Sequence, residues 1–413
     1  MKVLVVSSKY PPEYSGSGLR AHRTYLRLKE KFGIDFEVIC SSTESFEPET
    51  YHFEGAPVER IVSKPARFIN RKLANTPLRR ISNAVLIQIE AAKVKRKLKR
   101  SQFDLIHTFG FSPSTAAAIN YSRDHGVPLV LELVNPMPTP FQYLPGRKRL
   151  KTQDLSKQAA IVAIGKHLGD MCASHGLTEN VWVRPNPVDV GKFSLPTDIE
   201  RRAARTKISS ATENEVLVVY VAKYLARKNH SFLLDVLAKL PKHFKLVLAG
   251  PPLTDHDLVP GLTADQIPSL TQRANDLGIG DRVEISHGFV DMSEYLFAAD
   301  VFCFPSEKEA MGTPLLESIS SGVPVVANAD EPSFQEWIVD GENGYLRSLD
   351  AGNWAQAIIN AAEFGQDKKA KMSEDIKYSI SADLIDEQYR KLLSTLIETQ
   401  RDETVDVNRV MSS

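Results

Sequence analysis

The amino-acid sequence predicts an α/β protein built from two Rossmann-like domains, each with a doubly wound parallel sheet. Two observations lead to this fold class. The chain has 413 residues, of which 42% are hydrophobic, which is enough for about two domains of roughly 150 to 200 residues, each with its own core. Its short apolar segments also alternate with helical patterns in two successive series, one in each half of the chain.

The first series occupies the N-terminal half. Its apolar segments are short and nearly continuous, as expected for strands of a sheet that helices cover on both faces. In chain order they read KVLVVSS, DFEVICS, FDLIHTF, VPLVLELV and AAIVAIG. Helical patterns over 18–32 and 82–100 lie between them, and this alternation of strand and helix predicts a parallel sheet.

A polar segment over 195–215 separates the two series and shows no strand pattern. The alternation then resumes with VLVVYVA, FKLVLAG, RVEISHG, DVFCFPS and VPVVANA. Apolar residues at helical spacing over 382–399 predict a last helix before a polar tail. We therefore expect domains over 1–195 and 196–380, and a C-terminal segment over 381–413 whose helix can pack back on the first domain.

Composition restricts the class of protein. The three cysteines are widely spaced, so they predict neither a disulfide framework nor a metal knuckle and suit a reducing compartment. The apolar run after Met1 is too short for a signal peptide, and no apolar stretch approaches the length needed to span a bilayer. We expect a cytoplasmic protein.

The overall charge is balanced, with 51 basic and 51 acidic residues, which argues against a nucleic-acid-binding protein. The balance hides a basic stretch over 59–100, which contains 13 lysines or arginines and only two acids. This stretch predicts weak attachment to an anionic membrane, hence a peripheral position on its inner face. A solvated helix surface explains the same charges equally well.

The sequence YSGSGLRAH contains Gly16 and Gly18 in a pattern that fits the G-x-G-x-x-A fingerprint of NAD-binding proteins. Two features argue against NAD. The segment KYPPEYS separates the first strand from the glycines, and no acid follows the second strand, which ends in VICSS. What remains is a glycine loop that opens a helix at the carboxyl edge of the sheet, where backbone N–H groups can face an anion.

The second domain carries the stronger signal, SEKEAMGTPLLESISSGVPVVA at 306–327. Thr313 and Pro314 read as the N-cap and first residue of a short helix, which ends at Gly322. The helix therefore begins at the carboxyl edge of the sheet. There, the N–H groups of Met311, Gly312 and Thr313 suit a diphosphate.

Two acids flank this helix N-terminus. Glu317 lies one turn inside the helix, and its side chain can lean back toward a ribose. Glu309 lies on the preceding loop, where we expect an exposed side chain that binds sugar hydroxyls. Alternatively, both acids bind no ligand: they lie near the helix N-terminus because negative charge is favourable there, and they point into solvent. Lys223 and Lys228 follow the first strand of the same domain and could neutralise a departing diphosphate, although a pair of loop lysines is more often solvated surface.

These features resemble family 4 of the retaining glycosyltransferases, which have the GT-B fold, and the resemblance extends over nearly the whole chain. Its most specific parts are Glu309-x7-Glu317, RPNPVDVGKF at 184–193 and QEWIVDGENGYL at 335–346. SKYPPEYSGSG is similar to the family's glycine loop. The resemblance implies two domains that face each other across a cleft, the first on the acceptor side and the second binding a nucleotide sugar.

The resemblance also implies roles for individual residues. The first glutamate of the pair, Glu309, would hold hydroxyls of the donor sugar, and Glu317 would hold the ribose. Lys223 stands where the family usually has arginine, so bidentate phosphate geometry is lost while the charge is kept. Gly16 and Gly18 would approach the phosphates of the donor or the acceptor.

The chain departs from the family in one first-domain loop. Relatives often carry a histidine there near the reacting sugar, whereas this loop reads LELVNPMP, with Val134 and Asn135. Asn135 and Asn186 remain candidates to line the cleft. His107 lies at another strand end and is a further candidate, but a buried, hydrogen-bonded core histidine is the more frequent alternative.

The function that follows is transfer of a sugar from a nucleoside diphosphate sugar to an acceptor hydroxyl with retention of configuration, in the synthesis of a glycan, glycolipid or polysaccharide. The acceptor is expected to be a carbohydrate or, if the basic stretch attaches to a membrane, a lipid-linked molecule. We expect no cofactor and no metal, because the lysines and the helix N-terminus can replace one. Asp255 and Asp257 form a D-x-D pair, but it lies in a polar, proline-rich loop. A nucleotide-sugar epimerase of the same fold and an NAD-dependent oxidoreductase are the alternatives.

Overall fold

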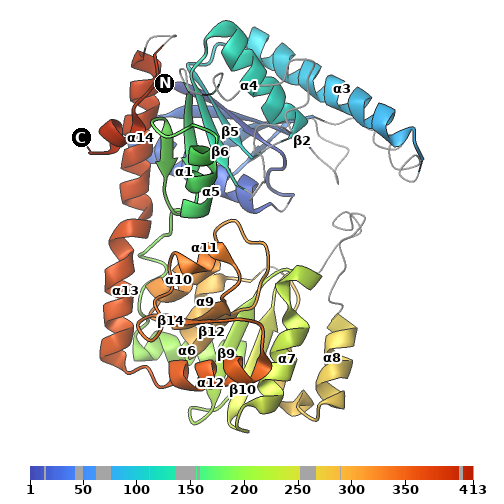
Figure 1. Cartoon of the computed structure of the whole chain (residues 1–413), viewed down its shortest axis with the longest axis vertical. Coiled ribbons are helices and arrows are strands. Elements are labelled where there is room, and N and C mark those ends of the chain that lie inside the picture. The colour runs from blue at the N-terminus through green and yellow to red at the C-terminus, as the bar shows by residue number, and fades with distance from the viewer. Residues whose placement is uncertain are drawn as a thin grey trace. The chain divides into compact units, whose positions relative to one another are not determined.

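The computed structural model describes residues 1–13, 15–41, 50–61, 76–110, 112–134, 155, 159–251, 267–288, 290–399 and 403–412. The chain divides into two compact units. The first unit comprises Met1–Arg184 and Ile385–Ser413, and the second comprises Pro185–Leu384. Each unit contains its own sheet, and Figure 1 labels many of the helices and strands of both.

The sheet of the first unit has eight strands in the order β3-β4-β2-β1-β5-β6-β7-β8. Among the described strands, neighbours pair in parallel except β3 with β4, which form an antiparallel hairpin. The strands are β1 (Lys2–Ser7), β2 (Asp35–Ser41), β3 (Thr50–Phe53), β4 (Ala56–Ile61), β5 (Leu105–Phe109), β6 (Leu129–Leu133), β7 (Ala159–Ala163) and β8 (Val181–Val183).

The helices of the first unit are α1 (Gly16–Phe32), α3 (Arg79–Arg100), α4 (Pro113–His125), α5 (Lys166–Ser174), α14 (Ala382–Glu398) and α15 (Val407–Ser412). Helix α14 starts three residues before Ile385, where the C-terminal segment of this unit begins. The ends of the helices follow local signals. Ser15 caps α1 by accepting the N–H of Gly18, and Ser112 and Thr115 form a capping box at α4. Helices α3 and α4 lie side by side (Figure 1).

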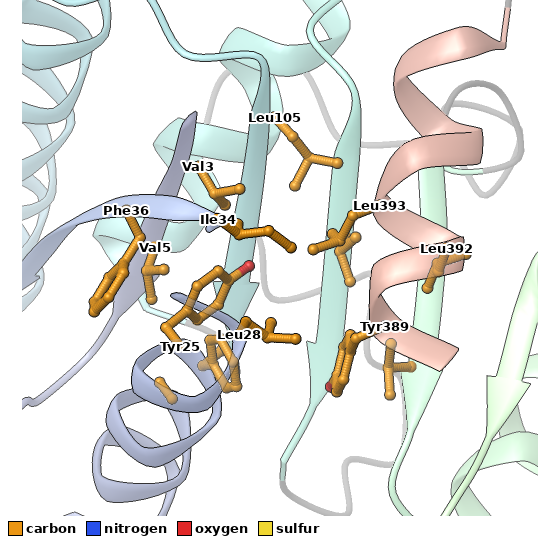
Figure 2. Close-up of a cluster of buried hydrophobic side chains, with 14 of the residues drawn as sticks. Val3, Val5, Tyr25, Leu28, Ile34, Phe36, Leu105, Tyr389, Leu392 and Leu393 are labelled. Atoms are coloured by element: carbon orange, nitrogen blue, oxygen red, sulfur yellow. The ribbon is translucent and has the colours of Figure 1, made fainter. Parts of the chain in front are cut away.

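The core of the first unit depends on the C-terminal helix. Figure 2 shows Tyr25 and Leu28 of α1 gathered with strand residues such as Val3 and with Tyr389 of α14. All four side chains are fully buried. Because burial of apolar area is the main favourable term in folding, residues from the end of the chain contribute directly to the stability of a domain that begins at its start.

The sheet of the second unit has six parallel strands in the order β11-β10-β9-β12-β13-β14. They are β9 (Val216–Val221), β10 (Phe244–Ala249), β11 (Val283–Ile285), β12 (Val301–Phe304), β13 (Val325–Asn328) and β14 (Gly344–Arg347). The helices are α6 (Asp198–Ile208), α7 (His230–Lys239), α8 (Ile267–Asp276), α9 (Met292–Ala298), α10 (Thr313–Ser320), α11 (Pro332–Gln335), α12 (Ala351–Ala362) and α13 (Gln366–Ile380), with 3₁₀ turns η2 (Ala226–Lys228) and η3 (Gly280–Arg282).

The polar segment at 195–215 does not divide the units. It forms α6, whose start is fixed by a capping box between Thr197 and Glu200, and whose Arg201 and Arg205 pair with Asp300 of the second unit. The division falls earlier, between Arg184 and Pro185, and the last segment of the first unit begins at Ile385. None of the helices in the described ranges is long and apolar enough to cross a membrane.

Candidate functional site

Helix α10 begins one residue earlier than its sequence suggests. Its N-cap is Gly312, in the left-handed region at φ 69°, so Thr313 is the first helical residue and not the cap. A Cβ atom at Gly312 would lie 2.6 Å from the ring of Phe334 and 3.1 Å from that of Phe304. The prediction that Thr313 is the N-cap is wrong. The N-cap residue has a left-handed backbone and lies between two aromatic rings, where only glycine fits.

Thr313 uses its hydroxyl elsewhere. The oxygen accepts a hydrogen bond from Asn186 Nδ2 at 2.7 Å, and Asn186 is itself buried. This contact joins one of the candidate residues of the sequence to the start of α10. The side chain of Thr313 is therefore held in place, and the backbone N–H groups of the first turn of α10 keep a fixed direction at the end of the helix.

Three loops meet at the carboxyl edge of this sheet, because β9, β12 and β13 are neighbouring strands. Hydrogen bonds tie the loops together. The N–H of Glu307 donates to Arg227 O at 2.9 Å, Asn229 Nδ2 donates to Pro305 O at 2.9 Å, and Asn328 Nδ2 donates to Ser306 O at 3.3 Å. These hydrogen bonds hold the three loops in fixed positions relative to one another.

The carboxylate of Glu309 forms an ion pair with Lys228 at this edge, and Arg227 Nη1 lies 3.5 Å from the same carboxylate oxygen. The side chains of Glu309 and Lys228 are each only 13% exposed. Glu309 is therefore not the exposed loop acid that its sequence context predicts, because a buried cation faces it. Burial lowers the pKa of Lys228, while the charge of Glu309 opposes this shift.

Arg227 and Glu331 are the two residues of this cluster that sequence reasoning did not single out. Arg227 also donates to the backbone carbonyl of Lys308 at 3.2 Å, so it supports the loop that carries Glu309. Glu331 lies just past β13 and accepts the N–H of Glu309 at 2.9 Å. The only sequence signals were the position of Arg227 next to Lys228 and the position of Glu331 after a predicted strand.

The other candidate residues of the second unit that the structure describes lie at the same edge. Met311 is buried beside Gly312. Glu317 is partly buried one turn into α10, and Lys223 is partly buried just after β9. Asp255 and Asp257 fall outside the described residues. Within the described part of the chain, no group of three or more His, Cys, Asp or Glu side chains is arranged to hold a metal ion.

In the first unit, Gly16 and Gly18 differ in their surroundings. A Cβ atom at Gly18 would lie 2.3 Å from the carbonyl oxygen of Lys9, whereas one at Gly16 would meet nothing within 4 Å. The N–H of Gly18 is also taken by Ser15 Oγ at 3.2 Å. Close packing therefore accounts for Gly18, while Gly16 is exposed and no contact of this kind requires a glycine there.

His107 is completely buried on β5. Its Nδ1 forms a hydrogen bond with the hydroxyl of Tyr25 at 2.8 Å, and its Nε2 lies 3.4 Å from the carboxylate of Glu132. Burial lowers the pKa of His107, which favours the neutral ring. The residue belongs to a polar network in the core. Val134 is buried, and Asn135 lies outside the described residues.

Two family models match this chain, one in each half. A family model described as "Glycosyltransferase Family 4" matches residues 14–192, and one described as "Glycosyl transferases group 1" matches residues 202–378. Each covers less than half of the chain. Neither model includes the C-terminal segment 385–413, and the second model spans Lys223, Lys228, Glu309 and Glu317.

Two curated relatives illustrate the similarity. The putative teichuronic acid biosynthesis glycosyltransferase TuaC of Bacillus subtilis (strain 168) is 25% identical over 408 residues, which are 92% of this chain and 94% of the relative. The lipopolysaccharide core biosynthesis glycosyltransferase LpsE of Rhizobium meliloti (strain 1021) is 29% identical over 196 residues, 46% of this chain. That match spans about half, 52%, of LpsE.

Solved structures share the fold. Sucrose-phosphate synthase from Thermosynechococcus elongatus superposes with a TM-score of 0.75 at 17% identity, covering 97% of this chain and 100% of the other. HepE of Anabaena, solved in complex with UDP and glucose, gives a TM-score of 0.70 at 18% identity, covering 96% and 100%. At such identities the likeness concerns the arrangement of helices and strands.

Proposed function

We propose that this chain, a glycosyltransferase with the GT-B fold, moves a sugar from a nucleoside diphosphate sugar to an acceptor hydroxyl with retention of anomeric configuration. The observation that carries the proposal is the cluster at the carboxyl edge of the second sheet, where Glu309 and Lys228 are held beside the N-terminus of α10. A sugar and a diphosphate are the two chemistries that such a cluster binds together.

Each part of the cluster has a role in this mechanism. The first turn of α10 and the ammonium groups of Lys228 and Lys223 stabilise the negative charge of the leaving diphosphate. Glu309 accepts hydrogen bonds from hydroxyls of the donor sugar, and Glu317 accepts them from the ribose. The helix and the lysines supply the positive charge that a metal ion supplies in other transferases, so the proposal includes no metal.

The chemical step is a displacement on one face of the sugar. The bond between the anomeric carbon and the diphosphate oxygen breaks, and the bond to the acceptor oxygen forms on the same face. The acceptor proton passes to an oxygen of the departing diphosphate. No carboxylate nucleophile takes part, so Glu309 acts by binding and orientation.

The names of the relatives support a cell-envelope or extracellular glycan as the acceptor. One relative is named for teichuronic acid and one for the lipopolysaccharide core. The complex of HepE with UDP and glucose supports a uridine diphosphate sugar as the first donor to test. A nucleotide-sugar epimerase is not favoured. It would convert the donor to an isomer without any acceptor, which chromatography of donor-only reactions detects.

Uridine or guanosine diphosphate is expected to raise the melting temperature of the protein, and NAD is not. A ligand at 100 times its dissociation constant adds about 2.7 kcal/mol to the stability of the form that binds it. Thermal unfolding with UDP, GDP, ADP and NAD in parallel measures this, with AMP as the control for the adenosine monophosphate part that ADP and NAD share. Stabilisation by NAD without stabilisation by any nucleoside diphosphate would contradict the proposed function.

We also propose that α3 attaches the enzyme to an anionic membrane, which places it next to a lipid-linked acceptor. Leu78, at the N-cap of α3, is 53% exposed, Ile81 is 63% exposed and Val85 is 49% exposed. Their spacing puts the three apolar side chains on one face of the helix. Exposed basic residues follow on later turns: Lys95, Arg96, Lys99 and Arg100. Lys97 forms ion pairs with Glu37 and Glu59.

This attachment predicts flotation with vesicles that contain phosphatidylglycerol and weaker flotation as salt increases. Each exposed lysine or arginine near such a surface contributes about 1 kcal/mol before screening. The variant I81E should reduce flotation because it places a charge in the apolar stripe. Ile199 is 81% exposed on α6, so I199E is the matched control. Equal flotation of both variants and the unchanged protein would rule out this surface.

A further inference from the structure

Glu331 connects two of the three loops at the candidate site. It lies just past β13 as the N-cap of α11 and is only 6% exposed. One carboxylate oxygen accepts the N–H of Ser333 at 3.3 Å and its hydroxyl at 3.1 Å. The other oxygen accepts the N–H of Glu309 at 2.9 Å. A single buried side chain therefore ties the loop after β13 to the loop after β12.

A capping role alone does not account for this residue. Helix α11 has four residues, and a shorter side chain such as serine or aspartate is the usual N-cap. The longer glutamate performs the cap with one oxygen and reaches a different loop with the other. The residue that it reaches is Glu309, the carboxylate at the centre of the cluster.

Glu309 is consequently fixed at two points. Glu331 holds its backbone N–H, while Lys228 and Arg227 hold its carboxylate. We infer that Glu331 is a positioning residue, which sets the backbone of Glu309 and so aims the Glu309 carboxylate at the hydroxyls of the donor sugar. This inference rests on the proposed function, because it assigns Glu331 a part in the same site.

The charge of Glu331 acts on the same cluster. The charges of Glu309, Arg227 and Glu331 act on Lys228, whose ammonium group lies 5.7 Å from the centre of the Phe304 ring. Burial and then Arg227 lower the pKa of Lys228, whereas the two carboxylates raise it. Removing the charge of Glu331 takes away one of the two carboxylate charges that raise the pKa of Lys228. The pKa of Lys228 should then fall further, so the ammonium group is lost at a lower pH.

Three substitutions separate the hydrogen bond from the charge. Alanine in E331A removes both. In E331Q the amide oxygen can still accept the N–H of Glu309, but the charge is gone. In E331D the charge remains on a side chain that is one methylene shorter. Glu342 is an exposed acid of the same unit, so E342Q is a matched control that changes net charge as E331Q does.

We expect E331A to lower kcat about tenfold, the order of a lost hydrogen bond to a charged group. Binding of the bare nucleoside diphosphate at neutral pH should stay within about twofold, because Glu309 acts on the sugar. The amide of E331Q should restore most of kcat near neutral pH. In E331Q the alkaline limb of the pH profile of kcat/KM should still move to lower pH. E342Q should match the unchanged protein in both respects.

Two results would overturn the inference. One is a pH profile of E331Q that coincides with that of the unchanged protein, together with normal kcat in E331A. The other is a parallel loss of nucleoside diphosphate affinity and activity in E331A without recovery in E331Q, which indicates a purely structural role. E309A is assayed beside them. If E309A is impaired and E331A is normal, only the role of Glu331 falls. If the unchanged protein transfers no sugar from any donor, the proposed function falls and this inference with it.

Discussion

Replacing Glu309 by alanine is expected to lower kcat by about 10- to 200-fold, because charge-assisted hydrogen bonds to sugar hydroxyls contribute about 1.5–3 kcal/mol. These bonds should tighten as the sugar flattens toward the transition state, so the loss should fall on kcat more than on KM. Steady-state kinetics with saturating acceptor measures the effect. Full activity in E309A would show that the acid has no part in the reaction.

The same substitution should also destabilise the protein. Lys228 would keep its buried position and lose the carboxylate that it faces, at a cost of about 1–3 kcal/mol. Glutamine in E309Q retains an acceptor for Lys228, so it should lose less stability than alanine while its activity still falls. Urea unfolding of both variants separates the two effects. A stability of E309A equal to that of the unchanged protein would contradict the ion pair.

Glu317 provides the contrasting variant. Its partner in the proposed function is the ribose, so E317A should weaken binding of the bare nucleoside diphosphate, whereas E309A should not. Titration of each variant with nucleoside diphosphate and with intact donor sugar distinguishes the two acids. Equal loss of nucleoside diphosphate affinity in both variants would mean that they do not contact different halves of the donor.

Buried strands were the most predictable part of the fold. DFEVICS coincides with β2 (Asp35–Ser41), and VLVVYVA contains β9 (Val216–Val221). Both are largely apolar and lie inside a sheet, where local pattern and burial agree. The strands that the sequence did not reveal are short or partly exposed. The hairpin strand β3 reads TYHF and alternates exposed with partly buried residues, so no apolar run marks it.

The candidate site was predictable in its residue types and less so in its contacts. Glu309 and Lys228 were found from their positions after strands, and the structure brings them together. The N-cap at Gly312 depends on the rings of Phe304 and Phe334, which a local helix signal does not include. The bond from the Glu309 N–H to Glu331 joins two loops. Such contacts follow from strand order, which sets which loops become neighbours.

The largest stability effect is expected at Glu132, which is completely buried on β6. Arg20 Nε lies 2.8 Å from one carboxylate oxygen, and Arg184 Nη2 lies 3.1 Å from the other. Tyr389 of α14 donates a hydrogen bond to this second oxygen at 2.6 Å. The carboxylate therefore links β6, α1, the end of the first segment of this unit and the C-terminal helix.

Glutamine at this position, E132Q, should cost about 3–5 kcal/mol, because it leaves two guanidinium groups near a neutral amide in the core. Urea unfolding measures this. Glu387 is 49% exposed and pairs with Arg390 on α14, so E387Q is the control and should leave stability almost unchanged, because water screens an exposed ion pair. Similar small effects of both substitutions would mean that the buried network does not hold the first unit together.

The pH dependence gives a second test of the same network. Burial alone would raise the pKa of Glu132, but the charges of Arg184 and Arg20 outweigh it and hold this pKa well below its ordinary value. A carboxyl with a lowered pKa in the folded state stabilises the protein above its unfolded pKa of about 4.3, and the contribution is lost as pH falls below that value. Stability of the unchanged protein should therefore decrease from about pH 5 downward, and E132Q should decrease less steeply. Parallel acid unfolding curves for the two proteins would show that Glu132 is not ionised in the core.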